Sequence, residues 1–338
     1  MQFANEAQVY KSDLGTQLQG DSRELIAEFP DNSIDLILTS PPFALLRKKS
    51  YGNKDQEEYV SWLLNFGEVA LPKLKETGSF VLDLGGAYQK GRPVRSLYNY
   101  RVLLRFCDEL GYRLAEEFFW FNPSKLPSPI EWVNKRKIRV KDAVNTVWWF
   151  SKSDSPKADV KKVLVPYSDR MKQLLKNPEK FYSPKKRPSG HDISERFADD
   201  RGGAIPPNLL SIPNTESTSH YLRTCKALGE DRHPARFPSA LPKFFIKFLT
   251  DQENLVVDIF SGSNTTGYVA ETMNRRWVSI ELRRDYATLS SIRFMEGIEI
   301  EAIRQLLDRM SNGELLDLQE HLPHLNQLRL LDESSEYS

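Results

Sequence analysis

The sequence predicts an α/β protein with a largely parallel sheet, and three features of the chain indicate this fold class. Short apolar runs typical of buried strands, such as 34–38 and 255–259, alternate with segments of helical spacing, such as 56–71. Strands and helices in alternation form a parallel sheet with helices on both faces. In addition, two strands end abruptly in loops of Pro, Gly and Ser, and the carboxyl ends of parallel strands are where such sheets bind ligands.

The alternation of elements is interrupted once, in the middle of the chain. Before the interruption we expect, in order, a helix, a strand, a helix, a strand, a helix and a strand over residues 22–28, 34–38, 56–71, 79–84, 97–110 and 115–121. Glycines mark several ends, because Gly85 and Gly86 close one strand and Gly111 stops one helix. After the interruption we expect a helix, a strand, a helix and a strand over residues 241–249, 255–259, from about 264, and 277–280.

This pattern predicts one α/β domain built from two halves, 1–121 and 233–300. Between them, residues 122–232 are rich in proline and basic residues and are expected to form an inserted, loop-rich module. The last segment, 301–338, carries 3 Lys and Arg against 8 Asp and Glu, and we expect an acidic helical tail there.

Composition excludes several classes of protein. The 338 residues are 40% hydrophobic and 28% charged, which is ordinary for a globular chain. No apolar run approaches the length that spans a bilayer, and the first residues do not resemble a secretory signal. Two cysteines, Cys107 and Cys225, and five histidines show no ligand spacing, so we expect no metal site and a reducing cytoplasm. Because no apolar run is long enough to span a bilayer, we also expect no membrane partner.

The net charge of +1 hides a strongly basic segment. Residues 121–190 contain 17 Lys and Arg against 6 Asp and Glu, with Trp132, Trp148 and Trp149 among them. Such a segment is typical of a polyanion-binding surface. It is equally typical of a solvated face with a few core aromatics, and composition alone does not decide between the two.

One candidate site is the loop that follows the strand at 255–259, where Asp258 precedes the run Phe260-Ser261-Gly262-Ser263-Asn264-Thr265. Glycine allows a close approach of the backbone, and the helix that follows offers unpaired N–H groups to a ligand. Glu281 ends the next strand, 23 positions after Asp258, where an acid can accept both ribose hydroxyls of an adenosine. The spacing lacks GxGxxG, which favours a nucleoside cofactor shorter than a dinucleotide. The alternative is a tight structural turn with a surface acid.

A second candidate site is Ser40-Pro41-Pro42-Phe43, just after the strand at 34–38. Consecutive prolines remove two N–H groups and leave rigid carbonyl acceptors. The Ser40 hydroxyl and the Pro41 carbonyl can accept the N–H bonds of an exocyclic amine, while Phe43 stacks on the ring that bears it. A ring presented in this way must first be swung out of a duplex. The alternative is a turn that only ends a strand.

Together these motifs resemble the amino-methyltransferases of bacterial restriction–modification systems, over most of residues 20–290. The order of catalytic motif, basic region and cofactor motif is similar to that of the permuted β class, and SPPF resembles the N4-cytosine group. The resemblance implies a Rossmann-like, S-adenosylmethionine-dependent methyltransferase fold with circularly permuted motif order and an inserted DNA-recognition region. It further implies methyl transfer to N4 of cytosine in double-stranded DNA, within a short palindrome such as CAGCTG. The implied context is a bacterial cytoplasm, alongside a cognate restriction endonuclease.

The resemblance also assigns residues to roles. The catalytic set is Ser40, Pro41, Pro42 and Phe43, with Asp83 either orienting Ser40, holding an amine proton or serving as a turn acid. The cofactor set is Asp258, Phe260, Gly262, Ser263, Asn264, Thr265 and Glu281, with His233 and Pro234 in a further cofactor-side motif. Asp21 either approaches the adenine side or caps the helix at 22–28. The DNA-binding set is Lys135, Arg136, Lys137, Arg139, Lys141, Lys185, Lys186 and Arg187.

Two other functions compete with this hypothesis. N6-adenine methylation uses the same fold and also holds an amine at a prolyl loop. A DNA-binding protein that has lost catalysis would not need the two intact motifs and the distant Glu281. A C5-cytosine enzyme is disfavoured, since it needs a nucleophilic thiolate and neither cysteine stands in such a setting.

Overall fold

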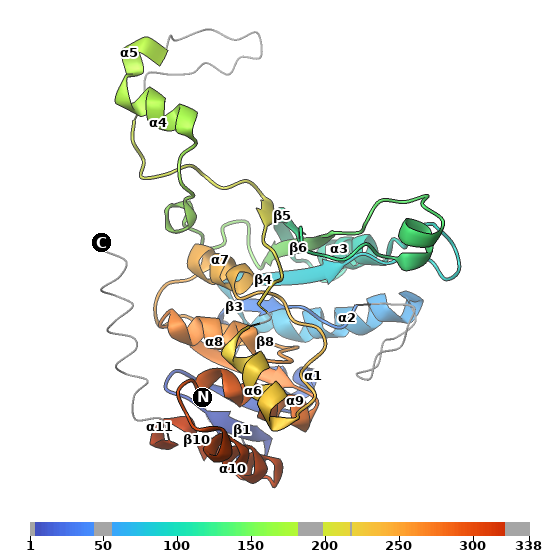
Figure 1. Cartoon of the computed structure of the whole chain (residues 1–338), viewed down its shortest axis with the longest axis vertical. Helices are drawn as coiled ribbons and strands as arrows, with labels where there is room; N and C mark the ends of the chain where they lie inside the picture. Colours follow the sequence, from blue (N-terminus) through green and yellow to red (C-terminus); the bar gives the residue numbers. More distant parts are fainter. Residues whose placement is uncertain (1–3, 44–55, 182–198, 217, 322–338) are drawn as a thin grey trace. The chain divides into compact units, whose positions relative to one another are not determined.

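The computed structural model describes residues 4–43, 56–181, 199–216 and 218–321 and divides into two units. The larger unit comprises Met1–Lys157 and Leu209–Ser338, and the smaller comprises Ala158–Asn208 (Figure 1). The separate unit is therefore much shorter than the insertion expected from the sequence.

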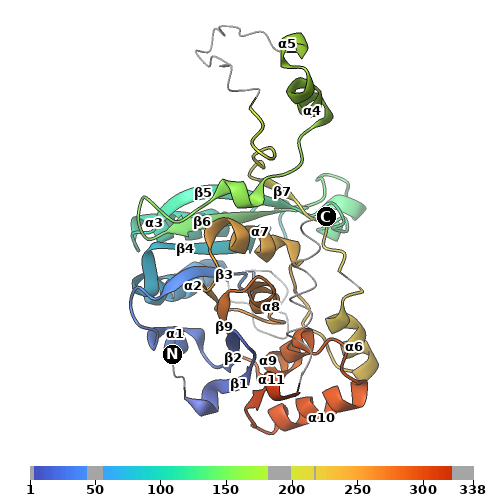
Figure 2. The same ribbon diagram turned by 90° about the vertical axis from the view of Figure 1, so that its left-hand side faces the viewer.

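One sheet forms the centre of the larger unit. In spatial order its ten strands in the described residues are β10 (Leu316–Asp317), β1 (Gln8–Lys11), β2 (Gly15–Gln19), β9 (Arg276–Glu281), β8 (Leu255–Asp258), β3 (Ile34–Thr39), β4 (Leu74–Gly85), β6 (Val144–Ser151), β5 (Arg113–Phe121) and β7 (Leu209–Ser211). The run from β2 to β4 is parallel throughout, while β6 is antiparallel to both of its neighbours. Figure 2 shows β6, β4, β3, β9, β2 and β1 succeeding one another across the sheet.

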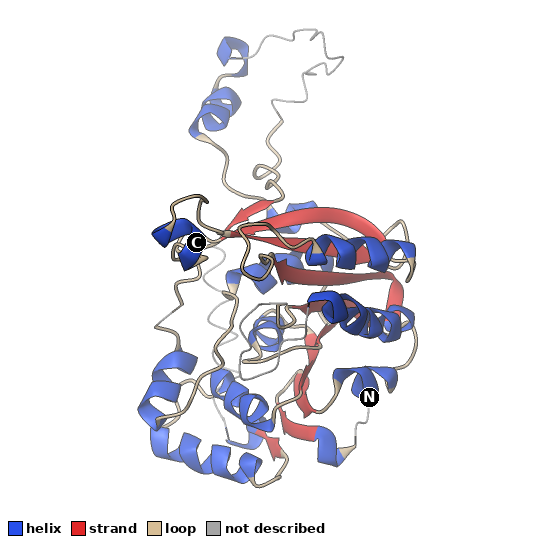
Figure 3. Cartoon of the chain, turned by 90° about the vertical axis from the view of Figure 1, so that its right-hand side faces the viewer, coloured by secondary structure: helices blue, strands red, loops and turns tan. Residues whose placement is uncertain are grey.

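Helices cover both faces of the sheet (Figure 3). One face packs on α1 (Ser22–Ala27), α2 (Gln56–Ala70) and α3 (Tyr98–Asp108). The other face packs on α6 (His220–Leu228), α7 (Ala240–Leu249), α8 (Thr265–Thr272), α9 (Arg284–Ser290) and α10 (Ile300–Ser311). Strand β3 is buried along its whole length, with Leu36 and Leu38 in one apolar core and Ile37 in the other, as the twofold period of a strand requires. The short elements are η1 (Asn5–Ala7), η2 (Leu71–Lys73), η3 (Glu131–Lys135), η6 (Ser291–Phe294) and α11 (Leu318–His321).

The direction of the chain changes between β3 and β8. The chain leaves β3 through α2 and continues to β4 on one side, whereas it leaves β8 through α8 and continues to β9 on the other. Parallel sheets open a crevice at such a point, just beyond the carboxyl ends of the strands. The two loops singled out in the sequence leave β3 and β8 at this crevice.

The predicted α/β class is confirmed, and each helix and strand expected outside the middle segment is present within a few residues of its predicted ends. The sequence did not reveal β1, β2, β6, β7, β10, α6 and α9. The first two form a short hairpin, with Tyr10 opposite Gln17.

The predicted bounds of the insertion, 122–232, do not match the division of the structure. Strand β6 lies inside that range, yet it pairs with β4 and β5 and brings Trp148 and Trp149 into the two cores, where each is at most 6% exposed. Strand β7 also belongs to the sheet. Of the three tryptophans in the basic segment, Trp148 and Trp149 are thus core residues, because a strand buried on both faces demands apolar side chains on both.

The smaller unit contains η4 (Val160–Val163), α4 (Asp169–Lys176) and α5 (Pro178–Phe181). Val165 and Ala204 exchange two backbone hydrogen bonds, at 2.9 and 2.8 Å, and so join its two ends. The Tyr167 hydroxyl contacts Asp200 and accepts a bond from the backbone N–H of Arg201.

The predicted acidic tail begins as a packed helix. Helix α10 buries Ile303, Leu306, Leu307 and Met310, and residues 322–338 lie outside the described part of the chain. No helix within the described residues is long and apolar enough to cross a membrane. In the same residues, no group of three or more His, Cys, Asp or Glu side chains is placed to hold a metal ion.

Candidate active site

A buried carboxylate joins the two candidate loops. Asp258, at the end of β8, accepts hydrogen bonds from the Thr39 hydroxyl at the end of β3 and from the Thr266 hydroxyl in α8, both at 2.7 Å. Asp258 is 2% exposed, and burial raises its pKa. Since the two bonds link loops more than 200 residues apart in sequence, Asp258 fixes the distance between the catalytic and cofactor candidates.

The loop after β8 has a conformation that its residues favour. Gly262 and Asn264 have φ angles of 50° and 53°, in the left-handed region that glycine and asparagine adopt most readily. The side-chain amide oxygen of Asn264, Oδ1, accepts hydrogen bonds from the backbone N–H of Gly267 and from the Ser279 hydroxyl, at 3.0 and 2.6 Å. A Cβ on Gly262 would lie 2.9 Å from the His233 ring. Only glycine therefore fits between the loop and His233.

Glu281, at the end of β9, faces the same loop. One of its carboxylate oxygens accepts the backbone N–H of Gly262 at 2.9 Å, and the other accepts that of Arg283 at 3.0 Å. Burial raises the pKa of Glu281, while these two backbone bonds act in the opposite direction. Each oxygen retains a second lone pair that can accept a hydroxyl of a ligand.

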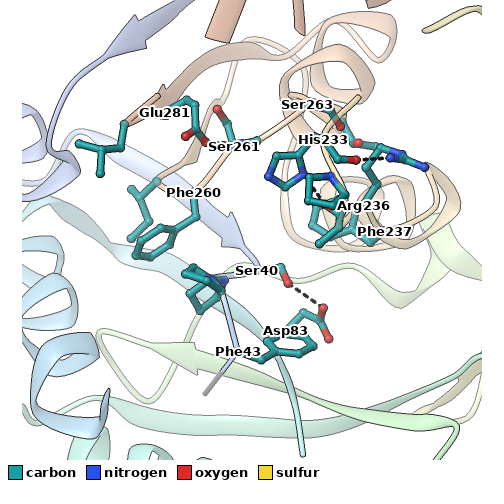
Figure 4. A pocket seen from close by; sticks show the side chains of 18 of the residues that line it. Ser40, Phe43, Asp83, His233, Arg236, Phe237, Phe260, Ser261, Ser263 and Glu281 are labelled. Carbon is teal, nitrogen blue, oxygen red and sulfur yellow. Dashed lines mark hydrogen bonds between the residues drawn. The ribbon is translucent and has the colours of Figure 1, made fainter. Parts of the chain in front are cut away.

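A cavity of about 680 Å³ contains both loops (Figure 4). One part of its wall comes from Glu281, Phe260 and residues 261–263, and another from Ser40, Phe43 and Asp83. Its volume lies within the range of small-molecule sites, which is about 300–1,000 Å³. One chamber thus holds the candidate cofactor residues and the candidate catalytic residues.

The catalytic candidates form a hydrogen-bonded chain. The Ser40 hydroxyl donates to one Asp83 oxygen at 2.9 Å, and the Asn145 amide donates to the other at 3.1 Å. Asp83 is 3% exposed, and burial raises its pKa to about 6, against the effect of the two bonds and of the nearby Lys125 charge. Asp83 is therefore in position to orient Ser40. Asn145 comes from β6, and sequence reasoning missed it.

Phe43 lies against the backbone beside this chain. A Cβ on Gly85 would lie 2.4 Å from the Phe43 ring, so the ring packs directly on the glycine at the end of β4. This contact fixes one face of the aromatic side chain near Ser40 and Asp83 (Figure 4).

Similarity to known proteins shows the family to which this chain belongs. A family model described as DNA methylase matches residues 34–291, which include both loops and the sheet between them. The chain belongs to the DNA methylase family.

Similar proteins agree with this assignment. The chain is 61% identical over 310 residues to the type II methyltransferase M.PvuII of Proteus hauseri, covering 91% of this chain and 92% of that protein. It is 52% identical to the solved PvuII DNA methyltransferase (cytosine-N4-specific), with a TM-score of 0.76 and coverage of 92% and 98%. A DNA modification methylase of Thermus thermophilus, solved in complex with S-adenosyl-L-methionine, is 17% identical over 88% of this chain and 96% of that one, and its TM-score of 0.51 shows a shared fold.

Three further predicted residues of this methylase lie at the cavity. Asp21 lines it and also caps α1, accepting the backbone N–H of Arg23 at 2.9 Å. The Arg23 guanidinium forms an ion pair with Asp21 and lowers its pKa. His233 and Pro234 line the cavity as well. The His233 ring packs edge-on against the Tyr286 ring, with the two ring centroids 4.6 Å apart. Nδ1 of His233 lies 2.6 Å from the Ala235 carbonyl, which can only accept, so that nitrogen carries the hydrogen.

Two of the predicted cofactor residues are buried behind the residues that line the cavity. Asp258 and Asn264 are buried and are not among the residues that line the cavity. Their polar atoms bond to Thr39, Thr266, Ser279 and Tyr10 instead. The prediction of direct cofactor contact from these two side chains is therefore not supported by their positions; they shape the loop whose other members line the cavity.

Arg293 holds the loop after β8 in place, and the sequence analysis did not predict it. Its guanidinium donates to the Ser263 carbonyl at 2.5 Å and to the Ser263 and Thr265 hydroxyls, both at 3.0 Å. Its side chain is 8% exposed and lies over the Tyr221 ring, 4.8 Å from the centroid. Burial lowers the pKa of Arg293, and no ion pair to it is found among the described residues. A positive charge thus lies directly behind two residues of the cavity wall.

The basic candidates divide into described and undescribed residues. Lys135, Arg136, Lys137, Arg139 and Lys141 belong to the loop between β5 and β6, and Lys185, Lys186 and Arg187 lie outside the described residues. Arg139 donates to the Ile138 and Pro93 carbonyls, and Lys141 donates to the Pro123 carbonyl. These two side chains therefore fasten the loop, whereas Arg136 lies over the ring of Trp132, 5.3 Å from its centroid.

Proposed function

We propose that this DNA methylase transfers a methyl group from S-adenosyl-L-methionine to the N4 amino group of cytosine in double-stranded DNA. The observation that supports it best is the hydrogen bond from Ser40 to the buried Asp83, in the same cavity as Gly262 and Glu281. Amine-binding and nucleoside-binding groups in one cavity are what in-line transfer between two substrates requires.

The residues present fit the cofactor. Gly262 leaves room that a Cβ would fill, and the Glu281 oxygens keep lone pairs for the ribose hydroxyls. Phe260, whose ring lies 4.7 Å from that of Phe66, gives an apolar wall for the adenine. Ser263 and Thr265, with the Arg293 charge behind them, suit the carboxylate of the methionine. When bound, the cofactor supplies an electrophilic methyl group on a sulfonium.

The chain's own residues prepare the amine. Because the Ser40 hydroxyl gives its hydrogen to Asp83, its lone pairs are directed to accept an N–H of the target amine. The Pro41 carbonyl accepts the other N–H, and Phe43 stacks on the base. These contacts hold the nitrogen lone pair toward the incoming methyl group. The surplus proton of the methylated amine then passes to Ser40 Oγ, while the Ser40 proton passes to Asp83 Oδ2, which is largely ionised above its pKa of about 6.

Cytosine is favoured over adenine by the residue before the two prolines. It is the neutral Ser40 here, as in the N4-cytosine group that SPPF resembles. The solved PvuII DNA methyltransferase, which is cytosine-N4-specific and 52% identical to this chain, supports the same choice.

DNA is the substrate because family and charge agree. The loop between β5 and β6, residues 122–143, contains six Lys and Arg against two Asp and Glu. We further propose a short palindromic target, with CAGCTG tested first, and a role beside a cognate restriction endonuclease in a bacterial cytoplasm. The type II methyltransferases among the relatives support this context.

Expression of the protein in bacteria that lack other DNA methylation, followed by sequencing that detects N4-methylcytosine, tests the proposal. We expect one methylated cytosine within one short palindrome, and a far weaker mark from the Ser40→Ala variant. Methylated adenine at a fixed site would assign the N6 reaction instead. Absence of any mark from a folded, cofactor-binding protein would favour a DNA-binding function without catalysis.

A further inference from the structure

Two apolar side chains stand fully exposed in the basic loop at 122–143. Leu126 is 81% exposed and Val140 is 87% exposed, higher than the other large hydrophobic residues of the described chain. A single exposed apolar side chain is ordinary. Two in one loop, one of them next to a residue that lines the cavity, indicate a surface that is covered during function.

Leu126 adjoins the active-site cavity, and the side chain of Lys141 links the residue after Val140 to the same stretch of the loop. Lys125 and Ala143 line the cavity, and Leu126 directly follows Lys125. The Lys141 ammonium donates to the carbonyls of Pro123 and Lys125, at 2.9 and 3.3 Å. Val140 precedes Lys141 and Leu126 follows Lys125, so each apolar residue adjoins one partner of the Lys141–Lys125 contact. Of these two lysines, Lys125 lines the cavity.

The loop is stiff and positively charged. Pro127 restricts Leu126 to extended backbone conformations, so that little further ordering is needed when Leu126 meets a partner. The two acidic residues of the loop are paired, Glu131 with Lys135 at 3.4 Å and Asp142 with Arg95 at 2.6 Å. Lys125, Arg136 and Lys137 form no ion pair within the described residues, so the loop presents free positive charge around its apolar pair.

We propose that Leu126 enters the base stack of DNA and fills the space left by the extruded target base. This inference rests on the proposed function, because a duplex base has to leave the stack only if its amino group must reach the active site. Apolar wedges of Leu or Ile between base steps are a known means of holding DNA open. Extrusion costs unpairing and unstacking, and a wedge at the cavity edge offsets that cost where the base enters the site.

Methylation rates on two duplexes test the wedge. One is a duplex that the wild-type protein methylates, beginning with CAGCTG; the other is the same duplex with the base opposite the target cytosine replaced by an abasic site. For Leu126→Ala we expect kcat/KM to fall about tenfold or more on the paired duplex. On the abasic duplex, where extrusion is easier, we expect a loss of less than about threefold.

Leu104→Ala is the matched control, since Leu104 is a 57% exposed leucine on α3 that does not line the cavity. It should change neither rate. Leu126→Met, which keeps apolar bulk, should retain most activity on the paired duplex. With 2-aminopurine at the target position, wild-type protein should raise the fluorescence of the duplex, and Leu126→Ala should raise it far less at saturating protein.

The outcomes separate the two proposals. If the wild-type protein transfers no methyl group to any DNA, the proposed function fails. If it does, but Leu126→Ala matches wild type on the paired duplex or loses the same factor on both duplexes, Leu126 is not a wedge. An undiminished 2-aminopurine signal from Leu126→Ala would overturn the wedge as well.

Discussion

Replacement of Asp83 by asparagine should make the protein more stable and nearly inactive. Asp83 is 3% exposed, and its burial raises its pKa to about 6 from the ordinary 3.8. The folded protein therefore bears a cost whenever this carboxylate is ionised. Asparagine has nearly the same shape and carries no charge. It can accept from the Asn145 amide and donate to Ser40 Oγ, so the hydrogen-bonded chain survives with the Ser40 bond reversed.

The size of the effect follows from the shift. The rise of the Asp83 pKa from 3.8 to about 6 corresponds to roughly 3 kcal/mol, since a tenfold change in proton affinity is worth about 1.4 kcal/mol. Because the folded-state pKa lies above the unfolded value, the folded state binds more protons between about pH 4 and 6, and stability falls as pH rises through that window. The loss is nearly complete about one pH unit above the folded-state pKa of about 6. Between pH 5 and pH 8 we expect the wild type to lose roughly 1–2 kcal/mol relative to Asp83→Asn.

Urea unfolding of both proteins at pH 5 and pH 8, without cofactor, measures this gap. Asp154→Asn is a suitable control, because the Asp154 side chain is 87% exposed and its removal relieves no burial. Methyl transfer by Asp83→Asn should fall by at least about a hundredfold, since the proton acceptor for Ser40 is gone. Wild-type turnover should decline below about pH 6, where Asp83 becomes protonated.

A gap between wild type and Asp83→Asn that stays constant or narrows from pH 5 to pH 8 would refute the reasoning. It would mean that hydrogen bonds to Ser40 and Asn145 outweigh burial and that the pKa of Asp83 is not raised. A gap of the same size for Asp154→Asn would assign the effect to net charge instead.

Four other substitutions test separate parts of the site. Ser40→Ala should lower kcat about a hundredfold or more with cofactor affinity unchanged, because the hydroxyl contacts Asp83 and the target amine rather than the cofactor. Glu281→Gln should weaken cofactor binding about tenfold or more, because an amide N–H would face a backbone N–H donor. Arg293→Lys should weaken cofactor binding about tenfold, since an ammonium cannot reproduce the fork that holds Ser263 and Thr265. Replacement of Arg136 and Lys137 by Gln should flatten the dependence of log Kd for DNA on log salt by up to about 1 per lost phosphate contact.

Each of these expectations can fail in a distinct way. Equal loss of turnover and cofactor affinity in Ser40→Ala would make Ser40 a structural residue. Unchanged cofactor affinity in Glu281→Gln or Arg293→Lys would remove that residue from cofactor binding, and isothermal titration measures both. Arg304→Lys, at a side chain 45% exposed on α10, is the control for Arg293. An unchanged salt slope would remove Arg136 and Lys137 from the DNA interface.

Local sequence signals were sufficient for the elements that carry the two motifs. The apolar runs that became β3 and β8 are short and bounded by Pro, Gly or Asp, and these signals place Ser40 and Gly262 at the ends of strands. The 23-residue spacing then places Glu281 at the end of the neighbouring strand β9.

Long-range pairing was beyond such signals. Strand β6 is flanked by basic and proline-rich residues, so its apolar run looked like part of an insertion, although it pairs with β4 and carries Asn145 to Asp83. Arg293 sits in an ordinary surface-like tetrapeptide, Ser291–Phe294, and only the packing of η6 against the cofactor loop reveals its contacts. Asp258 and Asn264 were placed at the right loop, but burial directs their polar atoms into the protein rather than toward the cavity.

The central claim is best tested by incubating the purified protein with DNA and labelled S-adenosyl-L-methionine, then digesting the DNA to nucleosides for mass spectrometry. Transfer from the Ser40–Asp83 site to cytosine predicts that the label appears in N4-methyldeoxycytidine. Label in N6-methyldeoxyadenosine or 5-methyldeoxycytidine, or no label in DNA at all, would contradict it.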